Sequence, residues 1–175
     1  MRPFSPKSTL KYIALWNAFR AVWMTFFVIL DLRSLAALGY KGPYFGIGLD
    51  ARFLLTIAVM PFKLLGVVAG FYFGRVGDMT VEIVAALTYA SVALGIWRRS
   101  SKMRHFAVAL NVFEALLLVL SLTYAVASPL LPELHLPFIL YFTSFAVVHS
   151  SVTIWLLQGR VKDSFAPGAT SAIGS

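Results

Sequence analysis

Residues 51–75 read ARFLLTIAVMPFKLLGVVAGFYFGR, and this stretch decides the class of fold. It is almost wholly apolar between Phe53 and Phe73. A helix of about 20 residues, rising ~1.5 Å per residue, crosses the ~30 Å hydrocarbon core of a bilayer. We therefore predict a transmembrane helix here and interpret the rest of the chain around it.

Small and polar residues interrupt this apolar run at regular spacing. Gly66, Gly70 and Gly74 recur every four residues and therefore share one stripe of a helix. Lys63 lies three residues before the first glycine, on the same stripe. Glycine stripes let the backbones of two membrane helices approach closely. We predict that this stripe is a helix-packing face and that Lys63 points at a neighbouring helix rather than at lipid.

The composition of the whole chain supports a membrane protein. The 175 residues are 59% hydrophobic and only 13% charged, whereas a soluble domain carries about 25% charged residues. A net charge of +8 would indicate nucleic-acid binding in a soluble protein. Here the basic residues flank apolar runs, as membrane orientation alone requires, and we expect no nucleic-acid partner. The chain has no cysteine, which excludes disulfides, thiolate metal sites and cysteine nucleophiles.

The apolar runs predict an all-α, polytopic integral membrane helical bundle in a single domain, residues 1–175. Short polar or glycine-rich segments separate the runs, including an expected turn at Val76–Met79. The tail, residues 166–175, is expected to be mobile. The predicted helices are an N-terminal helix at 12–37 and transmembrane helices at 52–75, 80–97, 106–127 and 137–158.

The N-terminal helix is open to two interpretations. Its polar residues Asn17, Arg20 and Asp31 lie on one face while Lys11 and Arg33 lie on another, and a surface helix would gather its charges on a single face. Placing the helix on the cytoplasmic surface, however, puts nearly all of the 15 lysines and arginines inside. We prefer four transmembrane helices plus an N-terminal membrane-associated helix, with five transmembrane helices as the alternative.

Two basic segments set the expected orientation. Residues 95–105 read GIWRRSSKMRH, and residues 154–165 read IWLLQGRVKDSF. Basic loops stay on the cytoplasmic side. We therefore expect a multi-pass protein of a bacterial-type cytoplasmic (inner) membrane with its C-terminus inside.

The same two segments resemble those of a group of uncharacterised bacterial four-helix integral membrane proteins. In that group a basic, tryptophan-bearing loop precedes the third helix. The last helix ends in an aromatic residue, two leucines, a turn, a valine, a basic residue and a phenylalanine. The resemblance covers roughly Ala51 to Phe165. It implies a four-helix topology and no particular activity.

Three titratable residues fall at a similar predicted depth in the membrane. Counted from the cytoplasmic helix ends at ~1.5 Å per residue, Lys63 lies ~16 Å deep, and Glu114 and His149 each lie ~13 Å deep. Asn111 shares the helix face of Glu114. An ionisable group inside a span costs about 2.5–3.5 kcal/mol on insertion scales, so each of the three requires a partner or a use.

This predicted buried polar layer has three interpretations. In the first, Lys63 and Glu114 form a structural ion pair that fixes which helices are neighbours, and His149 is hydrogen-bonded nearby. In the second, the layer handles protons or ions or binds a ligand head group. In the third, the residues never meet.

The sequence gives no positive signal for catalysis or for a cofactor. It contains no HExxH, P-loop, GxSxG or paired-carboxylate motif. His105 and His135 fall at opposite membrane edges, which disfavours haem, and we expect no metal and no cofactor. The expected function is that of a non-enzymatic accessory or stabilising subunit. Its expected partners are membrane lipid and other membrane protein subunits or a second copy. The alternative is a small proton, ion or solute transporter that uses Lys63, Glu114 and His149.

Overall fold

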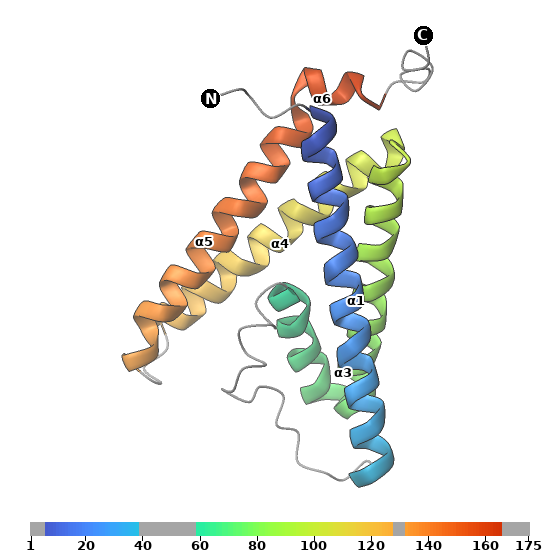
Figure 1. Ribbon diagram of the computed structural model, residues 1–175. Helices are drawn as coiled ribbons and strands as arrows, with labels where there is room; N and C mark the ends of the chain where they lie inside the picture. Colours follow the sequence, from blue (N-terminus) through green and yellow to red (C-terminus); the bar gives the residue numbers. More distant parts are fainter. Residues whose placement is uncertain (1–5, 39–58, 128–131, 166–175) are drawn as a thin grey trace. The chain divides into compact units, whose positions relative to one another are not determined.

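The computed structural model describes residues 6–38, 59–127 and 132–165, and these ranges contain helices and no strands (Figure 1). The long helices are α1 (Pro6–Leu38), α3 (Met60–Trp97), α4 (Ser101–Ala127) and α5 (Pro132–Leu157). The short helix α6 (Gly159–Asp163) follows α5 after one residue. The all-α prediction is therefore confirmed.

Four helices in the described ranges are long and apolar enough to cross a membrane. Their apolar stretches are Ser8–Leu30, Val68–Trp97, Ser101–Thr123 and Ile139–Leu157. The second contains a break at Gly74, so its continuous helix is the part after that residue. A membrane-embedded helical bundle is the fold that these helices support. The N-terminal helix α1 is one of the four, so its length and composition do not set it apart as a surface helix.

The helix bounds differ from the predicted ones mainly in α3, which covers parts of the two predicted helices 52–75 and 80–97. Residues Val76–Met79 are helical, so the turn predicted there is wrong. The regular helix is instead broken at Gly74, whose φ of 65° and ψ of −159° are not helical. The first part of the predicted span 52–75 lies outside the described residues, as does the predicted tail 166–175.

Gly74 divides α3 into two arms, 60–73 and 75–97, and the chain reverses direction between them (Figure 1). Contacts on both sides of the reversal show that the arms run antiparallel. A β-carbon added to Gly77 would collide with the backbone carbonyl of Ala69 and with Phe73, and one added to Gly66 would collide with Asp78. The predicted pair of separate helices is therefore a tight helical hairpin.

The chain falls into two compact units. The first, here called the hairpin unit, is Tyr12–Leu94, with most of α1 and both arms of α3. The second, here called the α4–α5 unit, combines Met1–Lys11 with Gly95–Ser175. Whether the two behave as the single domain predicted from the sequence stays a prediction.

In the α4–α5 unit, each helix buries one stripe. The buried residues of α4 recur every three or four positions, which is the period of a helix face, and those of α5 recur every seven. They are Ala107, Leu110, Asn111, Glu114 and Leu118 on α4 and Phe142, His149 and Leu156 on α5. The remaining faces carry exposed apolar residues such as Leu116, Leu120 and Val147, as expected of surfaces in contact with lipid.

Candidate functional site: buried polar clusters

The hairpin unit contains a buried charged cluster that joins the two arms of α3. The Lys63 Nζ lies 3.4 Å from Asp78 Oδ2 and also contacts Glu82 Oε1. All three side chains are buried. The ammonium also lies 4.7 Å from the centre of the Phe27 ring of α1, within the range of a cation–π contact. One lysine thus links both arms of α3 and reaches α1.

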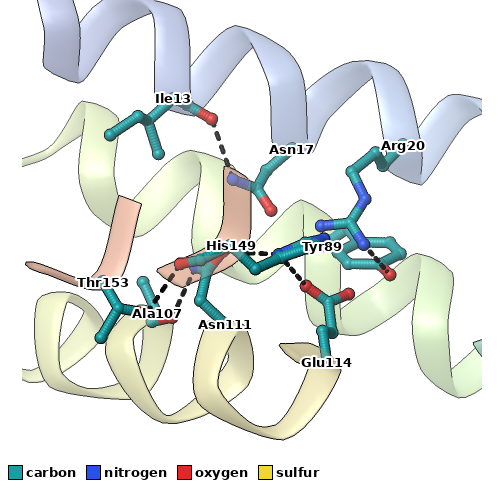
Figure 2. A network of polar contacts seen from close by, with 9 residues as sticks. All are labelled: Ile13, Asn17, Arg20, Tyr89, Ala107, Asn111, Glu114, His149 and Thr153. Atoms are coloured by element: carbon teal, nitrogen blue, oxygen red, sulfur yellow. Dashed lines mark hydrogen bonds and ion pairs between the residues drawn. The ribbon is translucent and has the colours of Figure 1, made fainter. Parts of the chain in front are cut away.

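The same unit contains a second buried cation, Arg20 of α1, which is 1% exposed. Its guanidinium carbon lies 3.8 Å from the centre of the Tyr89 ring, and Nη2 donates to the Tyr89 hydroxyl (Figure 2). Tyr89 in turn packs edge-to-face on Phe62, with ring centres 5.4 Å apart. An arginine inside a span is costly, and this contact with an aromatic ring and a hydroxyl offsets part of that cost.

The α4–α5 unit contains a polar triad of Asn111, Glu114 and His149 (Figure 2). His149 Nδ1 lies 3.1 Å from Glu114 Oε2 and 2.9 Å from Asn111 Oδ1. Asn111 and Glu114 are three residues apart, so they lie on one face of α4, opposite His149 of α5. The Asn111 amide also donates to the Ala107 carbonyl at 2.8 Å, which fixes its orientation. Glu114 and His149, for which the sequence predicts a similar depth, are thus in direct contact, and Asn111 joins them.

The triad places a carboxylate and an amide oxygen around one imidazole nitrogen. An ionised Glu114 carboxylate and the Asn111 carbonyl oxygen are both acceptors, so in that state the hydrogen of these contacts lies on His149 Nδ1.

The predicted polar layer is only partly assembled within the units. Glu114, His149 and Asn111 meet in the α4–α5 unit, whereas Lys63 belongs to the hairpin unit and has carboxylate partners there. The pairing of Lys63 with Glu114 would join the two units and stays a prediction.

The three stripe glycines have different roles. Gly66 faces Asp78 on the returning arm, as expected of a packing glycine, and Gly70 is buried. Gly74 does not pack against the residues that the structure describes: it is exposed, and none of their atoms lies within 4 Å of a β-carbon added there. Its assignment as a packing residue is therefore wrong, because it occupies the reversal where the backbone needs a positive φ.

The sequence reasoning missed Asp78 and Glu82 as the partners of Lys63. Asp78 lies within the turn predicted at Val76–Met79 and Glu82 lies just after it, so that prediction places both at the end of a span, away from Lys63. The signal was available: Asp78 and Glu82 are four residues apart and share a helix face. A reversal at Gly74 brings that face back onto the arm carrying Lys63.

A further buried cation joins the ends of α4 and α5. The Arg104 Nη1 donates to the Leu156 carbonyl at 3.0 Å, and Nη2 lies 2.9 Å from His105 Nε2. The last carbonyls of a helix have no partner within the helix, so the guanidinium caps α5. This contact places the beginning of α4 beside the end of α5.

The chemistry within reach of these clusters is proton binding and ion pairing. Within the described ranges, no group of three or more histidine, aspartate or glutamate residues is arranged to hold a metal ion. The clusters hold helices together and, at the Glu114–His149 pair, place a titratable proton inside the bundle. Comparison of the chain with protein-family models, with curated proteins and with solved structures yields no match.

Proposed function

We propose that this membrane protein is a non-enzymatic accessory subunit that packs against another membrane protein through α1. The proposal is carried by an aromatic stripe on that helix, defined here as Trp16, Phe19, Trp23 and Phe26. The rings stack on one another in succession, with centres 5.8, 6.2 and 5.3 Å apart. Trp16, Phe19 and Phe26 are 38–45% exposed and Trp23 is half-buried, so three of the four rings are exposed on the surface of α1.

The spacing of the stripe places its rings on one face of α1. The residues follow one another at intervals of three, four and three, which is also the seam spacing of helices that pack on other helices. The stripe is not an interfacial belt, because Phe19 and Trp23 lie near the middle of the apolar stretch Ser8–Leu30.

The internal ion pairs support the same function. Lys63, Arg20 and Glu114 each have a polar partner within their own unit. These contacts fix the positions of the helices within each unit. A rigid surface of this kind suits a subunit that stabilises a neighbouring protein.

The test is the mass of the native assembly after extraction in a mild detergent. We expect the wild-type chain to migrate in an assembly heavier than its own 19.3 kDa plus detergent. The double variant Phe19→Leu/Trp23→Leu keeps the helix apolar and should release the chain from the assembly. The control Phe71→Leu/Phe106→Leu removes two exposed aromatic rings from other helices and should leave the assembly intact.

Two results would refute the proposal: a wild-type chain that is a bare monomer, or an assembly that survives the loss of the stripe. An assembly whose mass is a whole multiple of the chain would identify the partner as a second copy.

A specific observation favours one other function, that of a small proton-coupled transporter. The Glu114–His149 pair is buried between two helices, and its carboxyl and imidazole are groups of the kind that carry protons. Proton relays in transport proteins are built from such intramembrane residues. In this alternative, Lys63 would belong to the same relay.

Reconstitution into vesicles that contain a pH-sensitive dye separates the two functions. A transporter would carry protons down an imposed gradient, and Glu114→Gln and His149→Gln would abolish that flux in a folded protein. Ser144→Ala removes an exposed hydroxyl from the same helix as His149 and serves as the control. An accessory subunit gives no flux in any of these variants.

A further inference from the structure

We propose that the α4–α5 unit binds the phosphate head group of an anionic phospholipid in a notch lined by Leu10, Lys11, Ile96, Trp97 and Arg99. The notch lies where the first turns of α1 meet the end of α3, and all five residues belong to the same unit. Its enclosed space is about 70 Å³, and one side is open to solvent. This is several times the space that one water molecule needs, so the notch is of a size for a phosphate group, with the rest of the lipid outside it.

The lining has the chemistry of such a site. Lys11 and Arg99 supply two cations, and the described residues that line the notch include no carboxylate. The planar guanidinium of arginine binds phosphate oxygens in pairs, and lysine adds a point charge. Leu10 and Ile96 are buried and form an apolar floor, which a free inorganic ion would not use.

Trp97 places the notch at the membrane surface. It is the last residue of α3 and is 61% exposed. Tryptophan at the end of a membrane helix lies at the level of the lipid head groups, with its apolar ring toward the chains. A basic pocket between helix ends at this level is the usual setting for head-group binding.

The backbone at Arg99 is strained. The α3 helix ends in a Schellman motif, in which Ser100 N donates to Gly95 O at 2.8 Å and Arg99 N donates to Ile96 O at 3.0 Å. The residue after the cap must then be left-handed, and Arg99 has a φ of 54°. Glycine occupies this position at no steric cost, whereas a residue with a side chain is strained there. The residue that bears this strain is also one of the two cations that line the notch.

This geometry makes an unusual prediction for Arg99→Gly. The substitution removes a lipid-binding cation and also relieves the strained backbone. In nanodiscs of phosphatidylcholine alone, the Arg99→Gly variant should therefore melt at or above the temperature of the wild-type protein. Its stabilisation by added phosphatidylglycerol should nevertheless be reduced.

The full experiment compares nanodiscs of phosphatidylcholine with nanodiscs of phosphatidylcholine mixed with phosphatidylglycerol. Phosphatidylglycerol should raise the melting temperature of the wild-type protein and remain bound through delipidation and native mass measurement. At roughly fivefold per basic residue near an anionic surface, Lys11→Gln/Arg99→Gly should weaken retention about 30-fold. The control Arg160→Gln/Lys162→Gln removes the same charge from α6, in the same unit but outside the notch.

Each outcome decides the proposal. The proposal is supported if Lys11→Gln/Arg99→Gly loses bound phosphatidylglycerol while the control Arg160→Gln/Lys162→Gln retains it. If both variants lose the same amount of bound phosphatidylglycerol, the attraction comes from the basic surface as a whole and the proposal is overturned. Stabilisation of the same size by inorganic phosphate, in phosphatidylcholine alone, would make the occupant a free anion and overturn the assignment to lipid.

Discussion

Gly74 is the residue on which the hairpin depends. Its φ of 65° and ψ of −159° lie in a region of backbone conformations that is open essentially to glycine alone. No neighbouring atom lies within 4 Å of a β-carbon added there, so space is not the reason that glycine is needed. The requirement is conformational, and it is separate from the packing role that its spacing in the sequence indicates.

Replacing Gly74 with alanine should therefore destabilise the protein although the new methyl group meets nothing. A residue with a side chain in this conformation costs on the order of 1–3 kcal/mol. We expect a loss of that size in the free energy of unfolding, measured by denaturant titration in detergent micelles.

Gly159→Ala is the matched control for Gly74→Ala. No atom lies within 4 Å of a β-carbon added at Gly159 either, but this glycine has no positive φ. Alanine is also the better helix former, so Gly159→Ala should be neutral or slightly stabilising. Equal effects of the two substitutions would show that the conformation of Gly74 is not what the hairpin requires.

At the scale of the element, α3 is held closed by charge as well as by close packing. Lys63 lies on the first arm, and Asp78 and Glu82 lie on the second. Gly66 and Gly77 allow the arms to approach closely enough for these side chains to meet. The close approach and the ion pairs therefore depend on one another.

Removing Lys63 alone should open the hairpin. Lys63→Met takes the ammonium away from two adjacent buried carboxylates, and removing one member of a buried ion pair typically costs about 3–5 kcal/mol. The triple variant Lys63→Met/Asp78→Asn/Glu82→Gln removes the charges together and should recover most of that loss. Thermal unfolding in micelles measures the loss of stability in Lys63→Met and its recovery in the triple variant.

Lys102→Met, at an exposed lysine of α4, is the control for these variants. It should leave the stability unchanged. If Lys63→Met lowers the stability no more than Lys102→Met does, the cluster does not hold the arms together. The same conclusion follows if the triple variant is as unstable as Lys63→Met.

At the scale of the whole molecule, the basic residues gather at one end of the α4–α5 unit. The Arg104 contact with the Leu156 carbonyl joins the beginning of α4 to the end of α5. The basic segment 98–104 and the basic residues of α6 therefore share an end. Glu133, in the first turn of α5, lies at the opposite end of that helix. By the rule that basic loops stay inside, the basic end is expected to be cytoplasmic.

The absence of cysteine from the chain makes this orientation easy to test. We expect Glu133→Cys to react with a membrane-impermeant maleimide in intact cells, and Ser101→Cys to react only after the membrane is opened. A reporter fused at Ser175 should behave as cytoplasmic. Labelling of Ser101→Cys in intact cells, or an external reporter at Ser175, would reverse the arrangement.

Much of the fold could be predicted from the sequence. Long apolar runs with few charges leave no alternative to membrane helices, because the backbone must satisfy its own hydrogen bonds in lipid. Helix α4 and helix α5 lie close to their predicted bounds for that reason. The similar depth of Glu114 and His149 could also be predicted, because depth along a helix follows from counting residues. Their contact could not, because depth does not say which helices are neighbours.

Only the tertiary structure decided at which residue α3 reverses and which side chains Lys63 contacts. Hydropathy is averaged along the chain, so an apolar run has the same appearance whether it continues through Gly74 or folds back there. The φ and ψ angles of a single residue decide between these two outcomes. The partners of Lys63 depend on that one reversal, which brings Asp78 and Glu82 back alongside the first arm. The composition and the lengths of the apolar runs determined a membrane helical bundle. The backbone conformation of Gly74 determined which carboxylates pair with Lys63.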